Sequence, residues 1–430
     1  MTNGDFHGQY LIPESGAAIQ DYLDDFLYTS WYTGNRKLVE LDSFGFPTEA
    51  NFTVSADPLI GSTVPQRVDF QGIPWGNKAI GPREYFRLYR LHTYSLACNH
   101  SDWSPDELSL DDVRISPHDP FFEFHTFYKT AACVKNHFHL CKSLAFFDEF
   151  SLLYVSESGI QGHNLLTKEV TDVFDLRSRI LQKNSICCLS ASQQLGCFGT
   201  LYGQYGIFNP KTQTCSIRKM HDESVNYIEL LNYRDSVVLG CNDGSVALEN
   251  IEKPDNQIIF RGTDAVNSTH PSPDLSQLLI CSDSKNVPIF DWRSNRIINE
   301  ISHSDSVLTG AWHPNGHILA TGGQDTTLKV WDSRFLKYPI RTLGSQMSAV
   351  TNVVFSSTGE SLAAVEQADF VQIYNTKTFS DCQIIDFFGE ISGASFSPSG
   401  DTFVVGLDDP MLGGLMEFRK AIPSHLTCFF

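Results

Sequence analysis

An all-β fold of seven similar units is what the sequence predicts, and three observations lead to it. Short apolar runs recur along the chain, and each ends in an aromatic residue or in a residue that replaces one. The residues at this position are Phe208, Glu249, Phe290, Trp331, Tyr374 and Glu417. They lie 41, 41, 41, 43 and 43 residues apart, and a weaker copy around His163 lies 45 residues before the first of them. Units of this length with several short strands are typical of the blades of a β-propeller.

Residues 318–334, ILATGGQDTTLKVWDSR, show the internal order of one unit most clearly. An apolar run, a polar turn and a second apolar run predict two short antiparallel strands joined by a tight loop. Another apolar run and a turn rich in Pro, Ser, Asn and Gly precede such a pair, as in VLTGAWHPNGH and ISGASFSPSGD. Each unit therefore predicts three strands and a linking fourth.

Residues 303–332, HSDSVLTGAWHPNGHILATGGQDTTLKVWD, resemble a nearly intact WD40 repeat, whereas the other copies are degenerate. The resemblance covers roughly residues 121–419 and implies a seven-bladed WD40-type β-propeller. In that family a His, a Ser or Thr, an Asp and a Trp form a buried hydrogen-bonded chain. The residues that match these positions are His303, Thr321, Asp325 and Trp331. The resemblance implies a structural role for all four, since a fully satisfied buried polar chain specifies one packing.

A second unit keeps only part of this set. His221 and Asp243 match the His and the Asp, but Glu249 replaces the Trp.

Closure of the ring is predicted to need a strand from before the first unit, because an open end would leave a bare sheet edge. The last unit, residues 391–420, supplies three strands only. The aromatic-rich segment FFEFHTFYKTA, residues 121–131, is therefore predicted to be the outer strand of that unit, as in the usual closure of the family. Residues 121–419 form the predicted propeller, and residues 420–430 a tail.

Residues 1–120 lack the repeat and are predicted to form an acidic, partly irregular extension, with 17 acidic and 8 basic residues. A short helix is expected near residues 82–95, because Pro82 suits a first helical turn and Tyr85, Leu88, Tyr89 and His92 follow at helical spacing. This aromatic and basic helix either packs against the propeller or binds a partner. Together with the degenerate repeats, the segment is similar to a poorly characterised group of fungal and plant WD-repeat proteins, which implies no activity.

Charge and composition restrict the partners. The formal net charge of −19 disfavours binding to phosphate backbones, so we expect protein partners, with basic surfaces as the natural complement, and no nucleic acid. No apolar run is long enough for a membrane helix, and no basic-then-apolar N-terminal signal is visible. Eleven cysteines without a CxxC pair fit a reduced compartment, so we expect a cytoplasmic or nuclear protein. We also expect a monomer within a larger complex.

The sequence predicts no catalytic, cofactor-binding or metal-binding residues, because the common phosphate-binding, nucleophile and metalloprotease motifs are missing. One segment, CVKNHFHLC, does place Cys133, His137, His139 and Cys141 on alternate positions, which would face one side of a strand. Residues two apart on a straight strand are about 6.6 Å apart, too far for neighbours to share one ion. Core cysteines and edge histidines are the favoured interpretation.

These features predict a non-enzymatic WD-repeat scaffold for protein interactions. One alternative comes from two Asp-x-Arg boxes at a spacing of 41 residues, Asp291 with Arg293 and Asp332 with Arg334. They resemble the boxes of WD40 substrate receptors of the cullin-4 ubiquitin ligase, which implies docking on the ligase adaptor through the arginines. The competing interpretation is that the Asp only closes a turn. A second alternative is an enzyme that uses the mouth of the propeller channel.

Overall fold

The computed structural model describes residues 70–73, 83–95, 114–115, 120–137, 139–175, 185–231, 235–253, 255, 257–409 and 412–421. The chain divides into two compact units, residues 1–92 and 93–430. Helix α2, Arg83–Ser95, spans this division and coincides with the helix expected near residues 82–95. Most of the predicted N-terminal extension and most of the predicted tail lie outside the described residues, so those domain limits stay predictions. No helix in the described part of the chain is long and apolar enough to cross a membrane.

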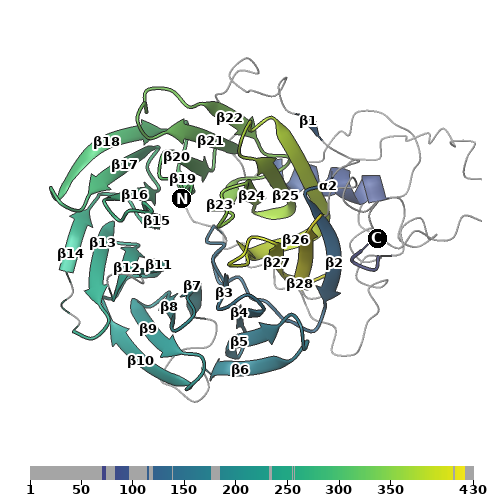
Figure 1. Ribbon diagram of the computed structural model, residues 1–430, viewed down its shortest axis with the longest axis horizontal. Helices are drawn as coiled ribbons and strands as arrows, with labels where there is room; N and C mark the ends of the chain where they lie inside the picture. Colours follow the sequence, from purple (N-terminus) through teal and green to yellow (C-terminus); the bar gives the residue numbers. More distant parts are fainter. Residues whose placement is uncertain are drawn as a thin grey trace, which may run out of the picture. The chain divides into compact units, whose positions relative to one another are not determined.

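Antiparallel sheets arranged as a ring make up the described part of the second unit (Figure 1). The first five sheets along the chain have four strands each, and we call them blades 1 to 5. Blade 1 contains β3 (Leu144–Phe146), β4 (Ser151–Ser156), β5 (Gly159–Asn164) and β6 (Val170–Asp175). Blade 2 contains β7 (Ile186–Ala191), β8 (Gly196–Thr200), β9 (Gln204–Asn209) and β10 (Thr214–Lys219). Blade 3 contains β11 (Val225–Leu231), β12 (Ser236–Cys241), β13 (Ser245–Asn250) and β14 (Gln257–Arg261).

Blades 4 and 5 repeat this order. Blade 4 contains β15 (Val266–Pro271), β16 (Gln277–Ser282), β17 (Asn286–Asp291) and β18 (Arg296–Ser302). Blade 5 contains β19 (Val307–Trp312), β20 (Ile318–Gly323), β21 (Thr327–Asp332) and β22 (Arg341–Gly344).

The remaining strands form one eight-stranded sheet, which β26 divides into two groups. These strands are β1 (Arg114–Ile115), β2 (Phe122–Tyr128), β23 (Val350–Phe355), β24 (Ser361–Glu366), β25 (Ala368–Asn375), β26 (Asp381–Phe396), β27 (Thr402–Asp408) and β28 (Gly414–Lys420). The first part of β26 pairs with β25 and the second part with β27. Gly389, at a φ of 136°, lies where the partner changes, in a backbone conformation that favours glycine. We call the two groups blade 6 and blade 7.

Blade 7 takes its outermost strand from the start of the propeller. Strand β2 pairs antiparallel with β28, from Phe122 opposite Lys420 to Tyr128 opposite Leu415. The segment expected to close the ring thus lies on the last strand. Residues Arg114 and Ile115 also add β1, in parallel, to the outer edge of blade 6.

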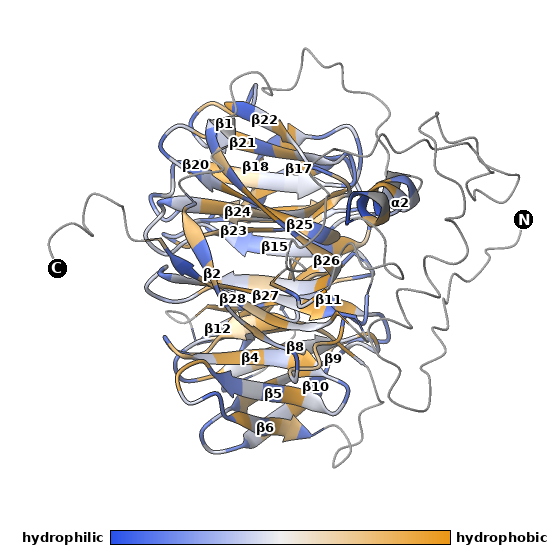
Figure 2. Cartoon of the chain, turned by 90° about the vertical axis from the view of Figure 1, so that its right-hand side faces the viewer, coloured by the Kyte–Doolittle hydropathy of each residue, from blue (hydrophilic) through white to orange (hydrophobic). Residues whose placement is uncertain are grey.

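Position in the blade explains why each strand has its residues. The first strands contact one another in succession around the ring, from β3 and β7 on to β26, which returns to β3. The second strand of blade 3, SVVLGC, is buried at every position because neighbouring blades cover both its faces. The outer strand of blade 4, RIINEIS, has only Ile301 buried. Figure 2 shows polar residues at the turns on both sides of the ring and apolar residues along the strands.

The all-β propeller prediction is confirmed by this architecture. The described strands form five four-stranded sheets and one larger sheet that β26 divides in two, and the predicted count of seven blades stays a prediction.

Candidate interaction site on the propeller

Blade 5 brings the four motif residues together as one buried hydrogen-bonded chain. The indole Nε1–H of Trp331 donates to Thr321 Oγ1 at 2.9 Å, and His303 Nε2 lies 2.7 Å from the same oxygen. His303 Nδ1 lies 3.0 Å from Asp325 Oδ2. Burial lowers the pKa of His303 against the raising effect of Asp325. Burial raises the pKa of Asp325, but hydrogen bonds from His303 and Thr327 outweigh it and hold that pKa well below its usual range.

The equivalent place in blade 3 holds a looser group, His221, Cys241 and Asp243, whose ligand atoms lie within 4.8 Å of one another. The backbone N–H of Glu223 donates to His221 Nδ1 at 3.1 Å, so Nδ1 carries the lone pair and Nε2 the proton in the neutral ring. Nε2 faces Asp243 Oδ1 at 3.7 Å and therefore has no lone pair for a metal in this tautomer. Burial also raises the pKa of the Cys241 thiol to about 12. The donor set fits a degenerate structural chain and does not fit a metal site.

An Asp or Asn ends the third strand of each of the first six blades and fixes the turn that follows. Its side-chain oxygen accepts the backbone N–H two residues later, an Asx turn. The turn residues are Asn164, Asn209, Asn250, Asp291, Asp332 and Asn375. Strand pairing places all these turns at one face of the ring, which we call the Asx face. In blade 5, for example, Trp312 pairs with Leu319, which pairs with Trp331 next to the turn.

Both Asp-x-Arg boxes lie on the Asx face, and their aspartates have the turn-closing role. Asp291 accepts the N–H of Arg293 at 2.8 Å, and Asp332 accepts that of Arg334 at 3.0 Å. Both arginines are exposed. The guanidinium of Arg334 also donates to both carboxylate oxygens of Asp332, at 2.9 and 2.6 Å, and lowers the pKa of that carboxyl to about 2. Turn closure therefore accounts for the Asp of each box and does not require the Arg side chain.

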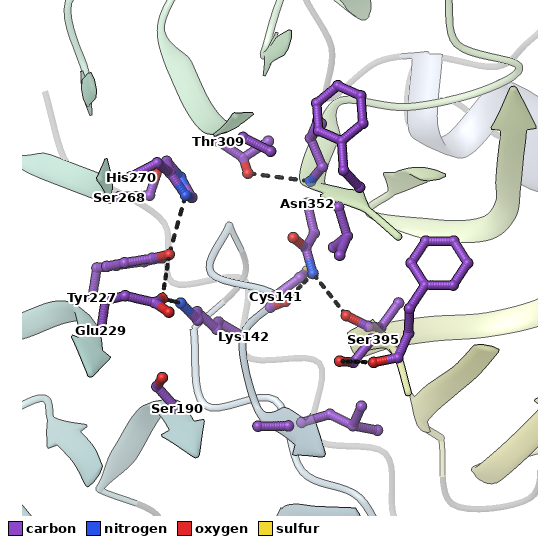
Figure 3. A pocket seen from close by; sticks show the side chains of 18 of the residues that line it. Cys141, Lys142, Ser190, Tyr227, Glu229, Ser268, His270, Thr309, Asn352 and Ser395 are labelled. Atoms are coloured by element: carbon purple, nitrogen blue, oxygen red, sulfur yellow. Dashed lines mark hydrogen bonds and ion pairs between the residues drawn. The ribbon is translucent and has the colours of Figure 1, made fainter. Parts of the chain in front are cut away.

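A cavity of about 500 Å³ occupies the channel and is lined by the ends of the first strands of several blades. Figure 3 shows a polar chain that crosses it from Lys142 to His270. The Lys142 ammonium pairs with Glu229 and lies 3.7 Å from the centre of the Tyr227 ring. The Tyr227 hydroxyl donates to Glu229 Oε2 at 2.9 Å and lies 3.2 Å from His270 Nδ1.

The tautomer of His270 fixes the direction of this chain. The N–H of Gly310 donates to His270 Nε2 at 3.1 Å, so the ring proton is on Nδ1 and points to Tyr227. Burial lowers the pKa of His270 far below its usual value and raises that of Tyr227. The imidazole therefore stays neutral and the phenol protonated near neutral pH. Each group in the chain has a hydrogen-bond partner, an arrangement that joins blades.

No sequence motif indicates this polar chain, because its members come from different units. One signal was available: Glu229 is a charged residue inside the apolar run of β11, VNYIELL.

The segment between β2 and β3 corrects one expectation. Cys133, His137, His139 and Cys141 do not lie on a strand, since residues 129–137 and 139–141 have no strand structure. Long-range contacts hold the segment instead: the N–H of Lys135 donates to Asp408 Oδ2, and Asn352 Nδ2 donates to the carbonyl of Cys141 at 3.1 Å. Both cysteines are buried, as expected for core positions. Among the described residues, these four do not gather into a metal-ligand group.

Comparison with known proteins agrees with this architecture. The family described as "WD domain, G-beta repeat" matches residues 295–332, within blades 4 and 5. Residues 295–332 therefore carry a WD40 repeat. The chain is 28% identical over 141 residues to "Periodic tryptophan protein 2 homolog" of Dictyostelium discoideum, a match that covers 29% of the chain and 15% of the relative. It is 22% identical over 208 residues to "U3 small nucleolar RNA-associated protein 15 homolog" of Xenopus laevis, covering 48% of the chain and 39% of the relative.

The chain therefore spans well under half the length of these curated relatives. Among solved structures, a chain of "Crystal Structure of Mitotic Checkpoint Complex" superposes with a TM-score of 0.59 at 17% identity, covering 72% of this chain and 95% of that one. At this identity the likeness concerns the fold. The expected similarity to a fungal and plant group stays a prediction.

Proposed function

We propose that this WD40 protein is a non-enzymatic scaffold that binds partner proteins through its Asx face. One observation carries the proposal: four of the six Asx turns present an exposed basic side chain two residues after the turn residue. These side chains are Lys211, Arg293, Arg334 and Lys377. A set of basic groups on one face of a chain with a net charge of −19 fits an acidic partner surface. The rest of the acidic chain remains free to attract the basic partners expected from its net charge.

The backbone of these turns supports a binding role. Each turn is fixed by a side-chain to backbone hydrogen bond of about the usual length, such as 2.9 Å from Lys211 N to Asn209 Oδ1. Basic groups on fixed turns lose less conformational entropy on binding than groups on flexible loops.

A channel-mouth enzyme is the weaker candidate. Four of the lining groups that could act as acid or base, Lys142, Glu229, Tyr227 and His270, hydrogen-bond or ion-pair with one another. Glu229 Oε2 accepts from Lys142 and Tyr227, and His270 Nε2 accepts from Gly310, so both groups are held within the polar chain. Assay of the purified chain against generic hydrolase substrates tests this candidate, with no turnover expected.

Docking on the cullin-4 ligase adaptor is the more specific candidate for the same face. Arg293 and Arg334 occupy equivalent, exposed turn positions of neighbouring blades, as that candidate requires. Arg334, however, is already paired with Asp332 and must exchange that partner for one on the adaptor. Recovery of the adaptor with the wild type but not with Arg293→Glu/Arg334→Glu would support this candidate.

Charge reversal on the two faces tests the scaffold proposal. Affinity capture with tagged wild type is compared with Arg293→Glu/Arg334→Glu, on the Asx face, and with Lys129→Glu/Lys285→Glu. The control lysines are exposed and lie at the opposite face, after β2 and between β16 and β17. We expect the arginine variant to lose partners that the control retains. Equal recovery with both variants, or no specific partner with the wild type, contradicts the proposal.

We infer the nucleus as the compartment. The support is the printed name of one group of relatives, which associates them with U3 small nucleolar RNA, together with the reduced cysteines of this chain. Fluorescence imaging of the tagged full chain tests this inference, and an exclusively cytoplasmic signal contradicts it.

A further inference from the structure

An apolar and basic strip runs along the outer rim of blades 4 and 5. It comprises residues 291–298 and 332–341, and we call it the rim strip. We propose that the rim strip binds a segment of a partner protein in which acidic side chains alternate with aromatic or aliphatic ones. This inference rests on the proposed scaffold function and names the chemical class of one partner.

Exposed apolar side chains are the first feature of the rim strip. It contains five large ones with 44–63% of their surface exposed: Ile297, Ile298, Phe335, Tyr338 and Ile340. Such side chains in a group mark interaction sites more often than the same residues scattered singly. Consecutive strand residues normally alternate between faces, but a bulge opposite Ile289 and Phe290 disturbs this order, and both Ile297 and Ile298 remain exposed.

The connection between β21 and β22 holds its aromatic residues on a fixed backbone. Residues 333–340 join these strands, whereas residues 292–295 suffice for the same connection in blade 4. Leu336 packs against the apolar cluster between blades 4 and 5, which includes Ile301 of β18. The N–H of Phe335 donates to the carbonyl of Asp332 at 2.9 Å, and that of Ile340 to Val330 at 2.7 Å. Fixed aromatic side chains are efficient binding anchors because little entropy is lost when they are covered.

The two parts of the rim strip belong to one surface. Lys329 Nζ of β21 donates to the carbonyl of Ser302 of β18 at 3.2 Å, so a hydrogen bond links the two strands across the boundary of the blades. They run in opposite directions, since a third strand ends at the Asx face and a fourth strand begins there. The chain after β21 and the start of β18, where Ile297 and Ile298 are exposed, therefore lie at the same face of neighbouring blades.

Charge selects the acidic component of the partner. The rim strip has five basic residues, Arg293, Arg296, Arg334, Lys337 and Arg341, and two acidic ones, Asp291 and Asp332. Both acids are engaged internally, Asp291 by Arg293 N and Ser294 Oγ, and Asp332 by Arg334. The surplus is positive on a chain whose net charge is −19. An acidic segment is attracted here, while its apolar side chains cover Phe335 and Tyr338.

Peptide display on the immobilised full chain tests the inference. A random dodecapeptide library should enrich peptides that contain both acidic and aromatic or aliphatic residues. The enriched peptide is then synthesised and its affinity measured by fluorescence anisotropy. Phe335→Ser/Tyr338→Ser should weaken binding at least about tenfold, as loss of two anchors does. Arg296→Glu/Lys337→Glu should weaken it as well and reduce its salt dependence.

The matched control is Phe150→Ser/Tyr202→Ser, which removes one exposed Phe and one exposed Tyr from blades 1 and 2. It should bind the peptide as the wild type does. Enrichment of peptides without acids, or equal affinities for the Phe335/Tyr338 variant and its control, overturns the inference. If either result occurs while Arg293→Glu/Arg334→Glu still loses partners in the affinity capture, the rim strip is excluded as the site for such a segment. The scaffold proposal then stands.

Discussion

Blades 5 and 3 have the same strand order but differ in the hydrogen bonds that hold the turn between their second and third strands. In blade 5, Asp325 accepts hydrogen bonds from His303, Ser304 and Thr327 and is 1% exposed. In blade 3, Asp243 bonds Ser245 and lies 3.7 Å from His221. Both sheets nevertheless keep buried central strands. Apolar patterning is therefore sufficient to form a blade, and the polar chain is an added stabilisation of one of them.

The largest expected effect comes from the tryptophan of blade 5. Trp331→Ala removes a large buried side chain and leaves Thr321 without its donor, so the free energy of unfolding should fall by roughly 3 to 5 kcal/mol. Because domains are stable by only about 5–15 kcal/mol, less soluble protein is also expected. Thermal unfolding measures the effect. A melting temperature within a degree or two of wild type would show that the buried hydrogen-bonded chain of blade 5 adds little to the stability of the protein.

A matched pair of aspartate substitutions compares the two blades directly. Asp325→Asn removes a charge-assisted acceptor from a buried site and should cost about 2 to 3 kcal/mol. Asp243→Asn, at the equivalent half-buried place, should cost about 0.5 to 1 kcal/mol, since its side-chain partners are fewer. Urea unfolding of both variants gives the difference. Equal costs would mean that the complete chain of blade 5 is no stronger than the partial chain of blade 3.

Acidification should weaken the blade 5 chain. The pKa of His303 is lowered from its ordinary 6.5 by burial, so the unfolded state binds a proton at a pH where the folded state does not. The contribution of His303 is complete above pH 6.5 and is lost as the pH falls below that value. His303→Gln should therefore flatten the pH dependence of unfolding in this range. An unchanged slope in the variant would contradict a neutral buried imidazole.

The smallest effect is expected on the Asx face. Arg334 pairs with Asp332 at the exposed surface, where an ion pair adds little to stability, so Arg334→Ala should leave the free energy of unfolding nearly unchanged. A larger loss would give this arginine a structural role and would weaken its use as a binding probe.

How much could be predicted from the sequence differs between these regions. The period of 41 to 43 residues and the turn residues predicted the strands, because both signals are local. The pairing of Lys142 with Glu229 could not be predicted, since the two residues come from different blades and meet only in the channel. Residues 133–141 look like a strand in sequence because their cysteines and histidines alternate, but the described residues of this segment have no strand structure. The exposed Ile297 and Ile298 look like core residues in sequence, and only the outer position of β18 exposes them.

Lysine-directed cross-linking of the wild-type chain with its captured partners shows whether the partners bind the Asx face. Exposed lysines lie on both faces: Lys211, Lys337 and Lys377 on the Asx face, Lys129 and Lys285 on the opposite one. Mass spectrometry should find partner cross-links concentrated at the first three lysines. Cross-links concentrated at Lys129 and Lys285, with Lys211, Lys337 and Lys377 unmodified by partners, would contradict the account.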